Sequence, residues 1–299
     1  LLLLTLSSAQ SQKYVIHNYT EEDGLPNSQV FDIVQDGDGY LYFSTRNKIG
    51  RVDGFSFLNY SLREHYTHYG YNRMLVDKNN RIWAYSNFSS LAVYFFENNI
   101  WRKLPTPACA NTSKKVLGND FGIIYKDRYN YCLAFSFRYS GIGYIANGEL
   151  TFFDKNSKLR DTIVNDIKVI DDKFWVCTRN GISIIQGDTI DNSINNLYDF
   201  PDKNILAVAQ DDIDSSKIWI LGKTFIGYIS NKKLSILVSD LDNFYDWSVR
   251  NYTIIPNYYS GVVFSDGLMI YIFDRITKKI TEISKDNGLI DNRPYGMCL

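Results

Sequence analysis

Six residues recur at nearly constant spacing along this chain of 299 residues, and four of them are positively charged. They are Arg46, Asn87, Arg138, Arg179, Lys223 and Asp266. The whole chain has a net charge of −1, so a generally basic composition does not explain these cations. Guanidinium groups bind carboxylate and sulfate oxygens through paired hydrogen bonds. These positions are therefore candidate ligand-binding residues for an anionic or highly hydroxylated ligand.

Three neighbouring residues extend this candidate site. Asn180 follows Arg179 directly, and the aromatic residues Tyr139 and Phe225 lie just after Arg138 and Lys223. Aromatic rings provide flat apolar surfaces, so we expect Tyr139 and Phe225 to stack on a sugar ring. The alternative interpretation is that loop residues are polar and charged only because loops are exposed.

Other patterns that could support chemistry are weaker. His65 and His68 have a spacing that could hold a metal on a helix, but surface histidines in a loop are the favoured interpretation. The two aspartates of the turn Asp36–Gly39 could suggest a calcium site, but the turn is too short for an EF-hand loop. Hairpin turns also favour Asp and Gly without binding calcium. No hydrolase, zinc-protease or nucleotide-binding motif is present. We therefore predict no catalytic residue, metal or cofactor, and the balanced charge favours no nucleic-acid partner.

The candidate residues belong to a repeat. Gly24 and Gly288 open similar segments 264 residues apart, which is six periods of 44. In the first copy, short apolar runs at 30–34, 40–44, 49–52 and 55–60 alternate with the turn Asp36–Gly39 and the turn Asp53–Gly54. Four strands in about 44 residues are typical of one blade of a β-propeller. We found no long segment with helical periodicity, so helix should be nearly absent.

The second strand of the repeat sets the register. It recurs at residues 81–85, 131–135, 173–177, 217–221 and 261–264, which aligns Tyr42, Trp83, Ala134, Trp175, Trp219 and Val262. Each candidate residue of the ring lies four positions after an aligned residue, and the third repeat has the least certain register. The three tryptophans are expected to be buried between blades. The loops that carry the ring are expected to converge near the propeller axis.

The ends of the repeat suggest how the ring closes. Residues 14–19 are expected to form an outer strand of a blade whose other strands come from the opposite end of the chain. Residues 293–299 are expected to form an inner strand of that blade, with further strands after Leu299. The sequence thus predicts an all-β propeller of six to seven four-stranded blades at 10–299, with an incomplete last blade. Residues 1–9 resemble the end of a signal peptide, which predicts export.

The first repeat resembles the two-component regulator propeller repeat of hybrid histidine kinases from Bacteroidetes-type bacteria. The matching positions are Gly24, Leu25, Val30, Ile33, Asp36, Gly39, Leu41, Thr45, Ile49, Asp53 and Gly54, with departures at Tyr42 and Lys48. The resemblance implies a periplasmic sensor that binds oligosaccharides. It also implies a further β domain, a membrane helix and a kinase, none of them within this sequence, and it allows a homodimer in the full-length receptor.

Three classes of function remain open from the sequence. A ligand-binding sensor module is favoured. A propeller lyase or glycosidase would need clustered carboxylates, His or Tyr on the ring's face, where the alignment provides only Asp266. The third class is a scaffold that presents surface without binding a small ligand.

Overall fold

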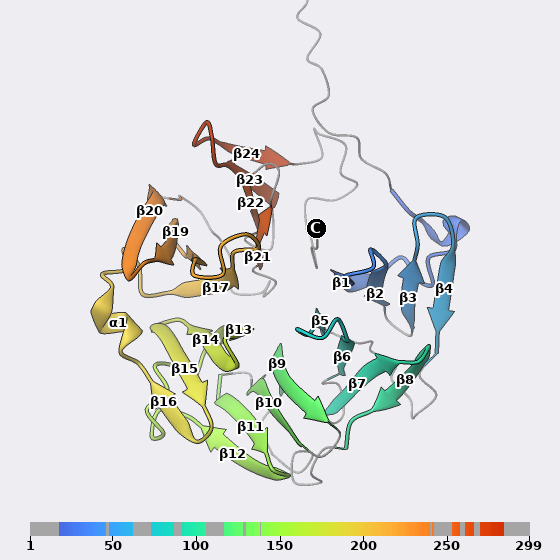
Figure 1. Ribbon diagram of the computed structural model, residues 1–299, viewed down its shortest axis with the longest axis horizontal. Coiled ribbons are helices and arrows are strands. Elements are labelled where there is room, and N and C mark those ends of the chain that lie inside the picture. Colours follow the sequence, from blue (N-terminus) through green and yellow to red (C-terminus); the bar gives the residue numbers. More distant parts are fainter. Residues whose placement is uncertain are drawn as a thin grey trace, which may run out of the picture.

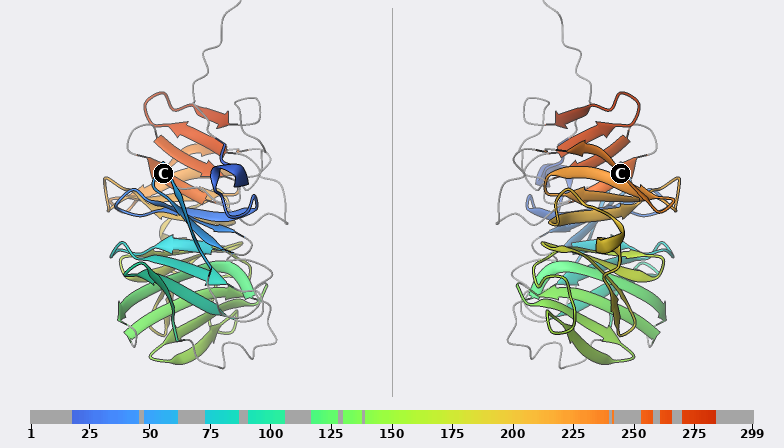
Figure 2. Two further views of the ribbon diagram at one scale, coloured as in Figure 1. Left: turned by 90° about the vertical axis from the view of Figure 1, so that its right-hand side faces the viewer. Right: turned by 90° about the vertical axis from the view of Figure 1, so that its left-hand side faces the viewer.

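The structure is a computed structural model, and it describes residues 18–45, 48–61, 73–86, 91–105, 117–127, 130–137, 139–239, 241, 253–257, 261–265 and 270–283. Within these residues it forms six four-stranded antiparallel sheets arranged as blades around a central axis (Figure 1). The molecule is narrower along this axis than across the ring (Figure 2). The prediction of an all-β propeller is confirmed.

The first three blades follow one another along the chain. Blade one contains β1 (Val30–Gln35), β2 (Leu41–Thr45), β3 (Ile49–Val52) and β4 (Phe57–Tyr60). Blade two contains β5 (Arg73–Val76), β6 (Ile82–Ser86), β7 (Ala92–Glu97) and β8 (Ile100–Lys103). Blade three contains β9 (Leu117–Asp127), β10 (Asn130–Phe137), β11 (Gly141–Ala146) and β12 (Glu149–Phe153).

The next three blades have the same order, with the first strand innermost (Figure 1). Blade four contains β13 (Val164–Ile170), β14 (Lys173–Thr178), β15 (Gly181–Gln186) and β16 (Thr189–Asp191). Blade five contains β17 (Ile205–Gln210), β18 (Ile218–Gly222), β19 (Phe225–Ser230) and β20 (Lys233–Ser239). Blade six contains β21 (Thr253–Asn257), β22 (Gly261–Ser265), β23 (Ile270–Asp274) and β24 (Ile280–Ile283). Described helix is limited to the 3-10 turn Glu21–Asp23 and to α1 (Ile194–Leu197).

Hydrophobic clusters hold neighbouring blades together. Five clusters of buried side chains lie between consecutive blades, from the pair of blades one and two to the pair of blades five and six. Among the described residues no sixth cluster joins blade six to blade one, and these two blades flank the remaining sector of the ring (Figure 1). The predicted shared blade uses residues 14–19 and 293–299, of which only Asn18 and Tyr19 are described, outside any strand, so it stays a prediction.

In blades two and five, an aspartate directly after the first strand accepts a hydrogen bond from the tryptophan of the second strand. In blade two, Asp77 accepts hydrogen bonds from the Asn79 and Arg81 amides through Oδ1 and from the Trp83 indole through Oδ2, at 2.8–3.0 Å. In blade five, Asp211 accepts from the Trp219 indole at 2.6 Å. One carboxylate thus closes the hairpin turn and fixes the tryptophan. The predicted burial of Trp83, Trp175 and Trp219 is confirmed.

The ring has two ends that differ in their connections. At the turn end, short turns join the first strand of each blade to its second strand. At the loop end, the second strands finish and lead to the third, and the chain also crosses between blades. These two ends position the two candidate sites described below.

Candidate functional site

The second strands of the six blades end at equivalent positions of the repeat. They end at Thr45, Ser86, Phe137, Thr178, Gly222 and Ser265, always three residues after the aligned position. The next residue in every blade is therefore the predicted ring residue at the loop end. The register is confirmed, including the third repeat. Four ring residues, Arg46, Asn87, Arg138 and Asp266, lie outside the described residues.

The backbone amides of Arg179 and Lys223 make equivalent hydrogen bonds in blades four and five. The Arg179 amide donates to the Ile163 carbonyl at 3.1 Å, and the Lys223 amide donates to the Asn204 carbonyl at 2.9 Å. In both blades the acceptor immediately precedes the first strand, so the ring residue ties the loop to the strand that borders the axis. Arg179 is half-buried, whereas Lys223 is exposed.

The loop after Arg179 has a defined conformation. The Asn180 carbonyl accepts from Arg160 Nε at 3.0 Å, and the Asn180 amide donates to Thr178 Oγ1 at 3.2 Å. Gly181 has a φ of 112°, which side-chain-bearing residues rarely adopt, and a Cβ there would collide with Asn195. The backbone that carries Arg179 is therefore fixed by local contacts.

The two aromatic candidates differ. Tyr139 is 56% exposed, so its ring is accessible at the surface. The prediction that Phe225 contacts the ligand is wrong, because its side chain is completely buried between blades four and five. Its ring stacks on Phe200 with centroids 6.2 Å apart and covers Gly222. Phe225 is the first residue of β19, and the first three residues of that strand are all buried.

A cavity of about 590 Å³ lies along the axis and was not predicted. The first strands of the blades form its wall, from Arg73 and Thr253 near the loop end to Asp77, Lys78 and Asp172 at the turn end. Lys78 and Asp172 are exposed, so the cavity reaches the surface at the turn end. The described ring residues Arg179 and Lys223 are not among the residues that line it.

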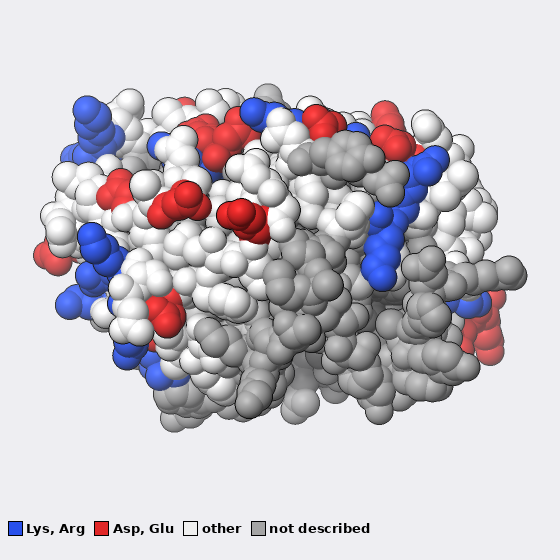
Figure 3. Space-filling view, turned by 90° about the horizontal axis from the view of Figure 1, so that it is seen from below, with Lys and Arg blue, Asp and Glu red and all other residues white. Residues whose placement is uncertain are grey.

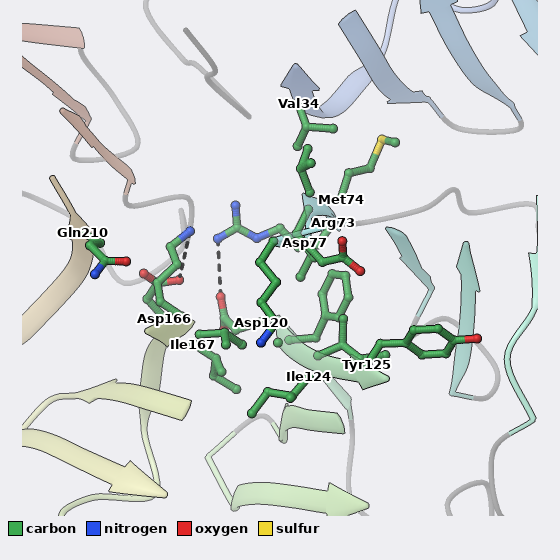
Figure 4. A pocket seen from close by; sticks show the side chains of 18 of the residues that line it. Val34, Arg73, Met74, Asp77, Asp120, Ile124, Tyr125, Asp166, Ile167 and Gln210 are labelled. Atoms are coloured by element: carbon green, nitrogen blue, oxygen red, sulfur yellow. Dashed lines mark hydrogen bonds and ion pairs between the residues drawn. The ribbon is translucent and has the colours of Figure 1, made fainter. Parts of the chain in front are cut away.

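Charged side chains from four blades meet at one level of the cavity. Asp32, Arg73 and Asp166 each pair with the next-to-last residue of the second strand in their own blades. Asp120 lies opposite the equivalent residue of blade three, since its amide donates to Ser136 Oγ at 3.2 Å. The three carboxylates are buried, and Figure 4 shows Arg73, Asp120 and Asp166 turned toward the same space.

Short contacts connect these charges. Arg73 Nη2 lies 3.4 Å from Asp120 Oδ1, and Lys168 Nζ lies 3.9 Å from Asp166 Oδ1 (Figure 4). Asp120 Oδ2 also accepts from Ser136 Oγ at 3.3 Å. Asp32 Oδ2 accepts from the Met74 amide at 2.8 Å, which links blade one to blade two. The group is an ionic layer across the channel, which we name the axial layer: Asp32, Arg73, Asp120, Asp166 and Lys168.

Burial changes the titration of two members of the axial layer. Burial raises the pKa of Asp120 to about 6, and the nearby Asp166 carboxylate adds to this effect, while the Arg73 guanidinium opposes it. Burial also raises the pKa of Asp32, against the opposing charge of Arg73 and the hydrogen bond from the Met74 amide. Carboxyl groups with raised pKa values are found at functional sites more often than elsewhere on a protein, so these two mark the cavity as a candidate site.

A signal for the axial layer exists in the sequence. Aspartate directly precedes an apolar residue within three first strands, at Asp32, Asp120 and Asp166. Charged residues are rarely buried unless they are paired, so such positions can point to a channel. These aspartates lie in the first strands, whereas the repeats were aligned on the second strands. They also occur in only three of the six blades, so the repeat alone does not reveal them.

The described residues contain neither a group of three His, Cys, Asp or Glu side chains that could hold a metal nor a helix long and apolar enough to span a membrane. His65 and His68 lie outside these residues. On the side shown in Figure 3, the described surface carries basic and acidic residues interspersed.

The predicted resemblance is confirmed by comparison with known families. Residues 24–47 match the family described as two component regulator propeller. No match is found among curated protein sequences.

Solved structures share the fold. The extracellular domain described as a hybrid two component system, BT3049 of B. thetaiotaomicron, is 20% identical, with a TM-score of 0.64 over 94% of this chain and 38% of that one. The extracellular domain of BT4673 from the same organism is 13% identical, with a TM-score of 0.60 over 90% of this chain and 35% of that one. The WD40 propeller domain of Doa1 is 12% identical, with a TM-score of 0.54 over 90% of this chain and 85% of that one. This chain thus spans well under half of the two B. thetaiotaomicron chains.

Proposed function

We propose that this chain is the periplasmic sensor propeller of a two-component signalling protein and that it binds an oligosaccharide at its loop end. The repeat match at residues 24–47 and the shared fold with extracellular domains of such systems support this role. The observation that carries the binding site is the equivalence of Arg179 and Lys223 within their blades. Export, a membrane helix and a kinase beyond this segment belong to the same proposal.

The ligand we propose is anionic, such as an oligosaccharide with uronate or sulfate groups. Arg179 and Lys223 present cations from adjacent blades, and the equivalent residues Arg46 and Arg138 extend the ring by register. A guanidinium can bind a carboxylate or sulfate through two parallel hydrogen bonds. Tyr139, Asn180, Asn87 and Asp266 remain in the proposed site as residues that contact sugar hydroxyls or rings.

The test is calorimetric titration with paired acidic and neutral oligosaccharides. Arg179→Ala should weaken binding of the acidic member by about 1.5–3 kcal/mol, which is the value of a hydrogen bond to a charged group. Lys173→Ala is the matched control, because Lys173 begins the same strand β14 and lies at the turn end. Both variants should keep the melting temperature of the parent.

Two results would contradict the proposal. The first is equal affinity of the parent and Arg179→Ala for an acidic oligosaccharide that binds the parent. The second is no binding of any acidic oligosaccharide. Analysis of the same mixtures for cleavage products separates a sensor from a propeller lyase or glycosidase, since a binding module leaves the oligosaccharide intact.

A further inference from the structure

The axial cavity has an acidic lining. Its wall contains six carboxylates, from Asp32, Asp77, Asp120, Asp166, Asp171 and Asp172. It contains only three cations, from Arg73, Lys78 and Lys168, so the formal balance is −3, compared with −1 for the whole chain. A concave site lined by one sign of charge concentrates its own field, because the protein walls screen less than water does. The cavity should therefore attract cations.

One carboxylate oxygen of the lining has no hydrogen-bond partner among the described residues. This atom is Oδ2 of Asp166, which is buried, and the residue as a whole is 2% exposed. The other oxygen, Oδ1, lies 3.9 Å from Lys168 Nζ, which is too long for a hydrogen bond. A buried charged acceptor without a donor is costly, so a ligand that supplies the donor is stabilised there.

The other carboxylates near Asp166 already have donors. Asp120 is contacted by Arg73 and Ser136, and Asp32 accepts from the Met74 amide. Asp77 closes its turn and holds the Trp83 indole. Asp166 is thus the acceptor that a ligand would contact, while Asp32 and Asp120 supply negative potential from two other blades.

We propose that the axial cavity binds a compact organic cation with a primary ammonium group, which donates hydrogen bonds to Asp166. The ammonium has three donors and one positive charge, so it satisfies Oδ2 and reduces the negative balance of the lining. Val34, Leu75 and Ile167 provide apolar wall for the carbon skeleton. A volume of about 590 Å³ has room for a ligand of the size of an amino sugar.

The test uses three probes that separate the ammonium from the rest of the ligand. Glucosamine has a ring and an amine, glucose has the ring alone, and ethanolamine has the amine alone. Dissociation constants are measured by ligand-observed NMR titration at pH 7 and low salt. Glucosamine and ethanolamine should bind, and glucose should not.

Two variants of the cavity should change glucosamine affinity in opposite directions. Asp166→Asn removes the acceptor charge and should weaken binding about tenfold to a hundredfold. Lys168→Met removes the cation that competes for Asp166 and should tighten binding. Asp188→Asn is the control, since Asp188 is exposed in the turn between β15 and β16. Lys168 is partly exposed, so its variant remains informative even where Asp166→Asn does not fold.

Several outcomes would overturn the proposal. They are glucose binding as tightly as glucosamine, weaker glucosamine binding in Lys168→Met, or no binding of either amine. The proposal is independent of the loop-end site, because Arg179→Ala should leave glucosamine affinity unchanged and Asp166→Asn should leave acidic oligosaccharide affinity unchanged. Failure at one site therefore does not imply failure at the other.

Discussion

The two candidate sites of this propeller use the same blades in different ways. The loop-end ring takes one residue from the same position of every repeat, so its cations follow directly from the register. The axial layer takes Asp32, Arg73, Asp120 and Asp166 from an equivalent level of four first strands, where the residue types differ from blade to blade. One site is a repeated feature of exposed loops, and the other depends on different residues meeting at the axis.

This difference has an energetic consequence. Of the described loop cations, Lys223 is exposed and Arg179 is half-buried, and substitutions of such surface residues usually change stability little. The axial charges are buried and depend on each other, so a change in one alters the field and the hydrogen bonds of the others. We expect substitutions at the loop end to affect binding alone, and substitutions at the axis to affect both binding and stability.

The largest expected effect comes from breaking the frame that both sites share. Trp83→Ala should lower the free energy of unfolding by about 3–5 kcal/mol, because Trp83 is fully buried and its indole bonds Asp77. Both ligands should lose affinity at temperatures where the variant unfolds. The measurement is thermal or urea unfolding. Trp101→Ala is the control, because Trp101 is only half-buried and lies on the outer strand β8. A parent-like unfolding curve for Trp83→Ala would contradict the assignment of this residue to the core.

The axial layer should also make stability depend on pH in an unusual direction. Asp120 has an ordinary pKa of 3.8 when the chain is unfolded and a pKa raised to about 6 when it is folded. The folded state therefore binds more protons than the unfolded state between these values, so this group's contribution to stability falls as pH rises from about 4 through 6. Below the unfolded value the cost of ionising a buried carboxyl is absent.

Asp120→Asn tests this pH dependence. In the parent, the Asp120 contribution should favour the folded state at pH 5 relative to pH 7.5 by about 1.4 kcal/mol, because the folded pKa lies about one unit above pH 5. Asp120→Asn should lack that contribution. The free energy of unfolding is measured at pH 5 and at pH 7.5 for each protein, and the change between the two pH values is compared between parent and variant. Asp211, whose pKa is lowered, contributes in the opposite direction in both proteins and cancels. Identical pH profiles for the two proteins would show that the Asp120 carboxyl is not buried as described.

Much of the fold could be predicted from the sequence because each blade repeats a local pattern. The strands expected at 30–34, 40–44 and 49–52 match β1, β2 and β3 to within one residue. Turn aspartates, turn glycines and alternating apolar residues all act within a few positions, so they are visible without tertiary information. Even blade three, which has the weakest repeat, keeps the spacing between Ala134 and the end of β10.

The prediction was least successful where contacts between blades decide the outcome. Phe225 follows a loop cation, as Tyr139 does, but only packing between blades four and five shows that its ring is internal. The axial layer brings together residues up to 136 positions apart, from Asp32 to Lys168, and the sequence shows only that an aspartate recurs in three of the first strands. Burial and pairing of those aspartates could therefore be known only from the assembled ring.

The smallest expected effect lies at the turn end, where Lys78 Nζ and Asp172 Oδ1 are 2.6 Å apart at the cavity rim. Both side chains are more than half exposed, so the ion pair should contribute at most about 1 kcal/mol to stability. Lys78→Ala should nevertheless tighten glucosamine binding about twofold, because it removes a cation from the path of the ammonium and frees the Asp172 carboxylate. The gain should disappear in high salt, which screens exposed charges but affects the buried Asp166 contact less. Lys155→Ala, an exposed substitution outside the cavity lining, serves as the control for net charge. A twofold gain in both variants would mean that the overall charge of the chain, and not the rim of the cavity, controls entry of the amine.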